Sequence, residues 1–134
     1  MSTLKDYGLF LQMLLNGGEL AGIRIISADS VKLMGTNVLQ KETLAKLDNN
    51  KQWDTKGAGF GLDFMVMLDP ARNGEKVGQG TMSWGGAAGT WFWIDPLNDL
   101  YFVGLVQTFD QNTKDELRPL SRKLTYKALV NPNK

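Results

Sequence analysis

The 134-residue sequence predicts an α/β fold of the α+β kind, in which an antiparallel sheet is packed with helices. Apolar residues recur at helical spacing near the start of the chain, alternate with a period of two over much of the second half, and return to helical spacing near the end. Short polar connections such as Pro96–Asp99 join the alternating runs, which is typical of antiparallel hairpins. We expect one partial domain over residues 1–134, with a helical segment over 1–50 and strands plus a last helix over 58–134.

The first helix is expected over residues 3–16. Thr3 is suited to cap its start, and Asp6 follows three residues later as in a capping box. Gly17 and Gly18 end it, because glycine readily leaves the helical conformation. Its apolar stripe is Leu4, Tyr7, Leu11, Leu14 and Leu15.

Two shorter helices should follow, one over residues 28–35 that Ser27 caps and one over 41–47. An extended link through the isoleucines at 23, 25 and 26 precedes the first of them. The stretch from Asp48 to Gly57 is polar and rich in turn-forming residues, so we expect an internal joint there.

The second half of the chain is expected to be mainly β-structure. Residues 60–68 alternate as one long strand that Asp69 and Pro70 end, and a turn follows at 72–74. A weaker strand is expected over 79–84. The strongest strands are 90–95 and 100–107, joined as a hairpin.

A last helix is expected over residues 117–130, with Pro119 in its first turn. Leu117, Leu120, Leu124 and Ala128 form its apolar stripe, and Arg118, Arg122, Lys123 and Lys127 are expected to face outward.

The strong hairpin is apolar on both faces, so each face needs a cover. The last helix covers one face at most. The other cover is expected from the N-terminal helices, from a partner chain or from a second copy. The strand at 100–107 is also expected to leave an open edge.

Composition narrows the classes of function. Fifteen basic and 14 acidic residues give a formal net charge of +1, which lacks the basic excess typical of nucleic-acid or anionic-membrane binding. No apolar run approaches the roughly 20 residues that span a bilayer. The compartment, periplasmic or cytoplasmic, stays open, because an export signal would lie upstream of this segment.

Cysteine and histidine are both absent. No disulfide can form, and neither a Ser-His-Asp nor a Cys-His arrangement can be assembled within the chain. A zinc or iron site would have carboxylate ligands alone, so we expect neither a metal nor a cofactor.

The most informative stretch runs from Ser83 to Pro96. Gly85, Gly86 and Gly89 leave the backbone bare, which a site needs when main-chain N–H groups must approach a substrate closely. Trp84 beside them offers a flat wall. The alternative interpretation of these glycines is a tight turn or β-bulge.

This stretch resembles the third active-site motif of the serine β-lactamase-like hydrolases. The likeness is greatest to the branch of class C β-lactamases and family VIII esterases, where Lys-Thr-Gly is often replaced by His- or Trp-Gly-Gly; D-Ala-D-Ala carboxypeptidases belong to the same superfamily. Residues 2–18 resemble the helix after the second motif of that family, and 59–62, 93–96 and 103–105 resemble strands around the third. The resemblance implies the C-terminal part of the β-lactamase/transpeptidase-like fold.

The resemblance also implies a chemistry. In the family, a serine in Ser-x-x-Lys attacks an acyl carbonyl and forms an acyl-enzyme, while the lysine and a tyrosine from Tyr-x-Asn transfer protons. By resemblance Trp84 would wall the acyl pocket, Gly85 and Gly86 would admit a small-molecule acyl substrate, and the Ala87 N–H would be an oxyanion donor. The substrate would be an ester, a β-lactam or a D-alanyl peptide.

The chain departs from the family pattern at the nucleophile. It contains no Tyr-x-Asn, and its one Ser-x-x-Lys, at Ser2 to Lys5, aligns with the helix after the second motif rather than with the nucleophile helix. We therefore expect no nucleophile in this chain, which alone would be inactive and would need an N-terminal segment of the same enzyme. The alternative is a non-catalytic, truncated remnant that folds by self-association.

Three other features have competing interpretations. Trp91 and Trp93 would suit a pocket, but sheet core is favoured. Asp63 and Asp95 would suit a pair of catalytic carboxylates, but a solvated strand position and a turn residue are favoured. Asp69, Asn73 and Glu75 lack the ligand spacing of an EF-hand, so a turn is favoured there.

Overall fold

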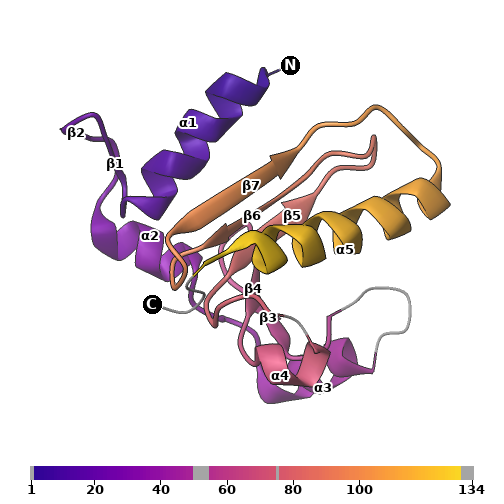
Figure 1. The fold of residues 1–134 in the computed structure, drawn as a ribbon. Helices are drawn as coiled ribbons and strands as arrows, with labels where there is room; N and C mark the ends of the chain where they lie inside the picture. The colour runs from indigo at the N-terminus through magenta and orange to yellow at the C-terminus, as the bar shows by residue number, and fades with distance from the viewer. Residues whose placement is uncertain (1, 50–54, 75, 131–134) are drawn as a thin grey trace.

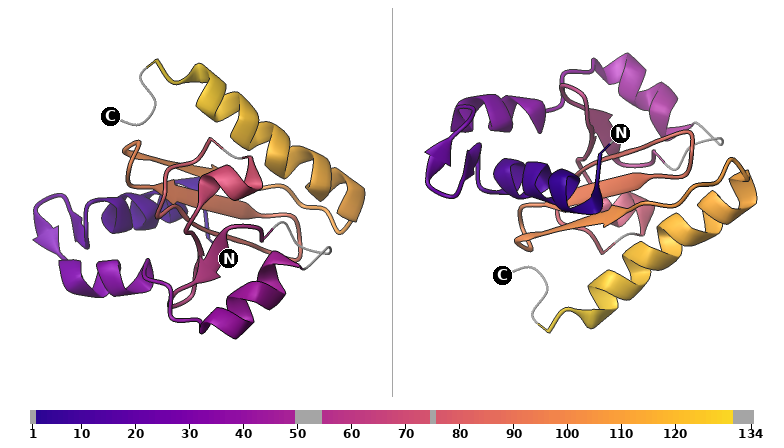
Figure 2. Two further views of the ribbon diagram at one scale, coloured as in Figure 1. Left: turned by 90° about the horizontal axis from the view of Figure 1, so that it is seen from below. Right: turned by 90° about the horizontal axis from the view of Figure 1, so that it is seen from above.

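The computed structural model describes residues 2–49, 55–74 and 76–130, and within them the chain forms a three-layer arrangement of helix, sheet and helix (Figure 1). Helix α1 (Leu4–Leu15) lies against one face of the main sheet, and helix α5 (Gln111–Ala128) lies across the other, as the two views of Figure 2 show. The remaining elements are β1 (Glu19–Leu20), β2 (Ile23–Arg24), α2 (Ala28–Met34), α3 (Lys41–Asp48), β3 (Ala58–Phe60), β4 (Met65–Met67), α4 (Pro70–Asn73), β5 (Met82–Gly85), β6 (Trp91–Asp95) and β7 (Leu100–Gly104).

The main sheet has five antiparallel strands in the order β3-β4-β5-β6-β7, and β1 pairs with β2 separately. Strand β6 lies between β5 and β7, so that Trp93 is opposite Ser83 on one side and Phe102 on the other. Strand β7 is the last strand of the sheet, which agrees with the expected open edge.

Each face of the sheet has its own hydrophobic cluster. Under α1, the buried Leu11 and Leu14 pack with Phe92 and Ile94 of β6. Under α5, Trp93 is fully buried and stacks on Phe102 with ring centroids 4.2 Å apart. The chain's own N-terminal helix thus provides the second cover that the two-faced apolar hairpin requires. Trp91 and Trp93 are core residues, as expected.

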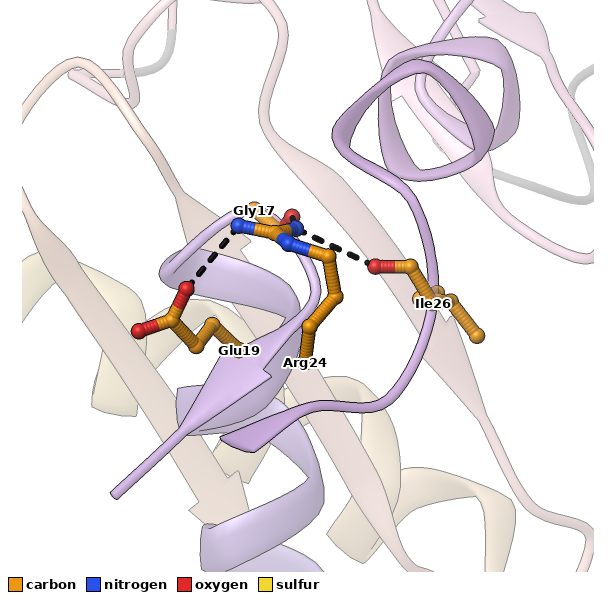
Figure 3. Close-up of polar contacts among 4 residues, drawn as sticks. All are labelled: Gly17, Glu19, Arg24 and Ile26. Carbon is orange, nitrogen blue, oxygen red and sulfur yellow. Dashed lines mark hydrogen bonds and ion pairs between the residues drawn. The ribbon is translucent and has the colours of Figure 1, made fainter. Parts of the chain in front are cut away.

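The N-terminal elements follow the sequence closely. The Thr3 hydroxyl accepts a hydrogen bond from the Asp6 N–H at 3.1 Å and caps α1, while Ser27 caps α2 in the same way through Ser30. At the other end of α1, the exposed Arg24 donates to the carbonyls of Gly17 and Ile26 and pairs with Glu19 at 2.9 Å (Figure 3). These bonds tie the β1–β2 hairpin to the helix end.

The single strand expected over residues 60–68 is wrong: the segment is a hairpin of β3 and β4. Gly61 N–H donates to the Phe64 carbonyl at 2.9 Å, and Asp63 between them has a φ of 69°. Gly61 lies so close to the α2 end that an added Cβ would be 1.9 Å from the Met34 carbonyl oxygen. Close packing against another element therefore turns the chain where the alternation alone suggests that it continues.

The other strand boundaries shift by a few residues. The turn expected at 72–74 is preceded by the single-turn helix α4, which Asp69 caps by accepting from the Ala71 N–H. Strand β7 ends at Gly104 rather than at residue 107. Most of the expected joint, residues 50–54, lies outside the described residues, as does Glu75.

The last helix differs most from expectation. It begins at Gln111, before the expected residue 117, because the Asp110 carboxylate caps it by accepting from the Thr113 N–H at 2.8 Å. Pro119 therefore lies inside the helix rather than in its first turn, at an exposed position.

The face that α5 turns to the sheet is also corrected. Leu120 and Leu124 of the expected apolar stripe are 42% and 55% exposed, and Ala128 is exposed as well. Arg118 and Arg122, expected to face outward, point toward the sheet instead. Two polar contacts fix this rotation: the Trp91 indole N–H donates to Ser121 at 3.2 Å, and the Tyr126 hydroxyl donates to Asp95 at 2.5 Å.

Candidate active site

The loop between β5 and β6 carries the glycine-rich motif. Strand β5 ends at Gly85, opposite Trp91. Beyond it, the Gly86 N–H donates to the Thr90 carbonyl at 2.7 Å, and the Gly89 N–H donates back to the Gly86 carbonyl at 3.2 Å. Gly89 has a φ of 92°, which only glycine adopts readily. The loop is therefore a closed, internally bonded turn.

The three expected substrate-binding residues, Trp84, Gly85 and Gly86, line one hollow of about 440 Å³. The rest of its lining comes from the start of α1, from β6 and from β7 with the residues after it: Ser2, Thr3, Tyr7, Thr90, Trp91, Phe92, Val103, Leu105 and Gln107. Trp84 is 41% exposed and meets Phe60 edge to face at 5.2 Å. Ala87 is exposed and lies on the loop next to the hollow, but it is not among the lining residues.

Two of the glycines lie against side chains of this chain itself. A Cβ on Gly85 would be 2.9 Å from Arg118 Nη2, because the guanidinium of α5 lies directly against this backbone. A Cβ on Gly86 would be 2.3 Å from Thr90 Oγ1. The bare backbone therefore admits protein groups on one side, in addition to any substrate.

Two cations of α5 bind the loop carbonyls. Lys114, only 8% exposed, donates from Nζ to the Ala87 carbonyl at 3.1 Å. Arg118 donates from Nη2 to the Gly86 carbonyl at 3.1 Å and to the Thr90 carbonyl at 3.4 Å. Sequence reasoning missed both residues. The signal that would have found them is their spacing of four, which places them on one helix face once Asp110 is read as the cap.

Fewer N–H groups than carbonyl groups of the loop are hydrogen-bonded. Within residues 2–49, 55–74 and 76–130, neither the Ala87 N–H nor the Ala88 N–H has a hydrogen-bond acceptor. The Ala88 carbonyl, by contrast, accepts from the Thr108 N–H at 3.0 Å. The loop therefore has two free donors beside bound acceptors, which is the arrangement that an anion requires.

Neither Ser2 nor Ser83 has a side-chain hydrogen bond to a base among the residues that the structure describes. Ser83 is 7% exposed and sits within β5, opposite Trp93. Ser2 lines the hollow but is itself exposed at the start of α1. Tyr7, whose pKa is raised by burial, packs its ring against Phe92 at 5.5 Å.

Asp63 and Asp95 do not form a pair. Asp63 lies in the β3–β4 turn, whereas Asp95 is completely buried at the end of β6. Asp95 accepts hydrogen bonds from the Gly78 N–H at 2.7 Å, from the N–H and the side-chain amide of Asn98, and from Tyr126. Burial, followed by the bond to Asp95, raises the pKa of Tyr126 far above its usual value. Asp63, expected at a solvated strand position, thus lies in a turn, and Asp95, expected to be a turn residue, is a structural anchor at the end of β6.

A second hollow of about 440 Å³ lies between α3 and α4 and is lined by Ala45, Asp48, Asn49, Lys56 and Arg72. Asp48 and Arg72 already form an ion pair there at 2.7 Å. The Gly57 N–H and Arg72 hold the pKa of Asp48 below its usual range. We assign no function to this surface.

Two further features are absent from the described part of the chain. It contains no cluster of three or more histidine, cysteine, aspartate or glutamate side chains that would hold a metal ion. None of its helices has the length and apolar character needed to cross a membrane.

Curated relatives share much of this chain but are far longer. The uncharacterized protein MT1414 and protein Rv1367c, from two strains of Mycobacterium tuberculosis, are each 40% identical to it over 115 residues. The match covers 79% of this chain and 27% of either relative. The chain thus corresponds to little more than a quarter of their length.

Solved structures share the fold. Simvastatin synthase (LovD) from Aspergillus terreus aligns with a TM-score of 0.65 and 20% identity, over 94% of this chain and 34% of its own. EstCE1, described as a hydrolase with promiscuous acyltransferase activity, aligns with a TM-score of 0.62 and 22% identity, over 82% of this chain and 27% of its own. At these identities the likeness shows the fold alone: helices around an antiparallel five-stranded sheet, as in β-lactamase-like proteins.

The family model described as Beta-lactamase matches residues 1–127, nearly the whole chain. The Trp-Gly-Gly stretch, the antiparallel sheet and the structural neighbours agree with that match. The chain therefore belongs to the β-lactamase family and has its serine hydrolase-type fold.

Proposed function

We propose that this chain supplies the oxyanion side of a serine acyl hydrolase active on esters, β-lactams or D-alanyl peptides. The observation that carries the proposal is the β5–β6 loop, where Ala87 is exposed and its N–H has no acceptor among the described residues. The carbonyls around it are bound. Such a donor is suited to a carbonyl oxygen that becomes negative when a serine attacks.

The nucleophile comes from a separate segment in this proposal. A serine hydroxyl of Ser-x-x-Lys attacks the substrate carbonyl and passes its proton to a base. The resulting oxyanion is stabilised by the Ala87 N–H, and its collapse expels the leaving group and gives an acyl-enzyme, which water then hydrolyses. A donor of this kind contributes roughly 3–4 kcal/mol of transition-state stabilisation. The chain alone would have no turnover.

The hollow beside the loop is proposed to hold the acyl group. Trp84 and Phe92 give it aromatic walls, and Val103 and Leu105 add aliphatic surface. A concave, mainly apolar surface next to a few placed polar groups is typical of a small-molecule site. The description of EstCE1 as a hydrolase and acyltransferase is consistent with acyl chemistry on this fold.

Labelling with a fluorophosphonate or a penicillin probe, read by intact mass, tests the placement of the nucleophile. We expect no adduct on the 134-residue chain and an adduct on a second segment that carries Ser-x-x-Lys. Ser2→Ala and Ser83→Ala chains are the matched controls. An adduct on this chain that disappears in either control would place the nucleophile here and refute the proposal.

Trp84→Ala tests the acyl pocket in the enzyme reconstituted with the nucleophile-bearing segment. We expect kcat/KM to change with acyl-chain length across a series of esters, because one wall of the hollow is removed. Leu97→Ala, at an exposed position in the opposite hairpin loop, is the control. An unchanged chain-length profile would remove Trp84 from the site.

A second candidate, a non-catalytic chain that self-associates, is favoured by one observation. Strand β7 ends the sheet, and Leu105 and Phe109 just after it are 43% and 81% exposed. An exposed strand edge with apolar neighbours is prone to pair with another chain. Sedimentation of the isolated chain at micromolar concentration is expected to show association. A compact, stable monomer would exclude this candidate.

A further inference from the structure

We propose that Arg118 and Lys114 are positioning residues for the oxyanion loop: by holding its carbonyls, they turn the Ala87 and Ala88 N–H groups away from α5 and keep them free. This inference rests on the proposed function of the loop. The two residues act through the backbone, so neither is assigned a direct contact with substrate.

The first step is the geometry of a peptide unit. The described chain has no cis peptide bond, and in a planar trans peptide the C=O and N–H bonds point in opposite directions. The Gly86 carbonyl and the Ala87 N–H belong to the same peptide. Because Arg118 holds that carbonyl from the α5 side, the Ala87 N–H must point away from α5. Lys114 fixes the Ala88 N–H in the same way through the Ala87 carbonyl.

The second step is that the loop has little freedom to rotate these peptides. The Gly86 carbonyl accepts from both Arg118 and the Gly89 N–H, and the Thr90 carbonyl accepts from both Arg118 and the Gly86 N–H. Turning the Gly86–Ala87 peptide over would break two bonds and leave the Arg118 guanidinium only its longer bond to the Thr90 carbonyl. Loss of an acceptor by a partly buried charge is costly, so the observed orientation is favoured.

The third step is charge. Neither Lys114 nor Arg118 forms an ion pair within the described part of the chain, where the salt bridges are Arg24–Glu19 and Arg72–Asp48. No carboxylate among these residues forms an ion pair with either charge, although the Asp110 carboxylate that caps α5 interacts electrostatically with Lys114. A cation on a carbonyl also polarises the peptide and strengthens its N–H as a donor. Both effects favour negative charge developing at Ala87.

The fourth step explains why β5 ends in glycine. The Arg118 guanidinium reaches the loop by lying on the Gly85 backbone, and a Cβ there would be within 3.1 Å of Cζ and both terminal nitrogens. Arg118 and Gly85 thus form a matched pair. The i, i+4 relation of Lys114 and Arg118 on one helix then places both charges over consecutive carbonyls.

The nitrogen chemical shift of a backbone amide responds to hydrogen bonding at the carbonyl of its own peptide, so heteronuclear NMR on the isolated chain tests the geometry. We expect Arg118→Met to move the Ala87 amide nitrogen and Lys114→Met to move that of Ala88. The conservative variants Lys114→Arg and Arg118→Lys should restore much of each wild-type shift. Lys123→Met, at an exposed position on α5, is the matched control and should move neither. The proposal is overturned if Arg118→Met leaves the Ala87 nitrogen shift unchanged and Lys114→Met leaves that of Ala88 unchanged.

The same variants in the reconstituted enzyme test the catalytic consequence. Loss of an oxyanion donor lowers kcat about 10²- to 10³-fold, and loss of its positioning should cost less, roughly 10- to 100-fold in kcat with KM little changed. The conservative variants should recover part of the loss. If Arg118→Met does not fold, Lys114→Met and Lys114→Arg give the comparison of loss with recovery. An unchanged kcat in a folded Lys114→Met enzyme overturns the positioning role. If the wild-type enzyme has no turnover, the proposed function is refuted instead. The changes in the Ala87 and Ala88 nitrogen shifts would still support the loop geometry.

Discussion

The two loops that flank β6 are both held in place by α5, yet they are bonded in opposite ways. At the β5–β6 loop, cations of the helix bind carbonyl oxygens and leave N–H groups free. At the β6–β7 loop, the buried Asp95 carboxylate accepts from N–H donors, among them Gly78 and Asn98. The first loop has its carbonyls held by cations, whereas the second has its Asn98 donors held by a buried carboxylate.

This difference separates a functional loop from a structural one. A loop whose acceptors are occupied can bind only what its free donors attract, which is an anion or a developing oxyanion. A loop that is bonded to a buried carboxylate, as Asn98 is to Asp95, serves to fix the chain. Helix α5 supports both roles, through Lys114 and Arg118 in its first half and through Tyr126 near its end.

The largest effect is expected from breaking the structural loop. Asp95→Asn replaces two carboxylate acceptors by one acceptor and one amide donor, which would face the N–H and O–H groups now bound to Asp95. Bonds to a buried charge are worth about 1.5–3 kcal/mol each, so we expect a loss of about 3 kcal/mol in the free energy of unfolding, measured by urea denaturation. Asp99→Asn, in the same loop at a positive φ that asparagine tolerates, is the control. A loss equal to that of the control would contradict the anchor role.

The next largest effect is expected from breaking the functional loop. Gly85→Ala places a methyl group against the Arg118 guanidinium and should cost about 2 kcal/mol, as overpacking does. The same change in an Arg118→Met background should cost clearly less, because the side chain that it displaces is gone. Additive losses in this double-mutant cycle would mean that Gly85 and Arg118 are not coupled.

Stability measured over a range of pH tests the bond between Tyr126 and Asp95 at the structural loop. Tyr126→Phe removes one hydrogen bond to Asp95 and should cost about 1.5 kcal/mol at pH 7. Because the pKa of Tyr126 is raised in the folded chain, the unfolded chain loses this proton first as pH rises above the ordinary value of 10.0. The contribution of Tyr126 is thus full below that pH and decreases above it. The stability difference between wild type and variant should narrow from pH 10 upward; a constant difference would refute the assigned contact.

The smallest effect is expected on the side of α5 that touches neither loop. Leu124 is 55% exposed, so Leu124→Ser should change the free energy of unfolding by less than about 0.5 kcal/mol. Thermal unfolding would measure it, with Leu117→Ser on the side facing the sheet as a destabilising comparison. A large loss at Leu124 would indicate that this surface is covered in solution, for example by a second copy of the chain.

The sequence by itself determined the elements whose signals are local. The capping side chains of Thr3 and Ser27 mark the starts of α1 and α2, because a cap depends on residues within one helical turn. The alternation around Trp91 and Trp93 gave the central hairpin. The Trp-Gly-Gly stretch pointed to the family, and it also drew attention to Trp84, Gly85 and Gly86, which the structure places along one hollow.

Only the tertiary structure decided which side chains of α5 face the sheet. The leucine stripe of α5 predicts an apolar contact face, but the Trp91 indole N–H, the Asp95 carboxylate and the carbonyls of Gly86 and Ala87 all need polar partners from that helix. These needs turn Arg118 inward and leave Leu124 in water. Periodicity shows which residues of a helix are apolar. The rotation of the helix is set by the polar groups on the underlying surface that still need hydrogen-bond partners. Those groups come together only when distant parts of the chain meet.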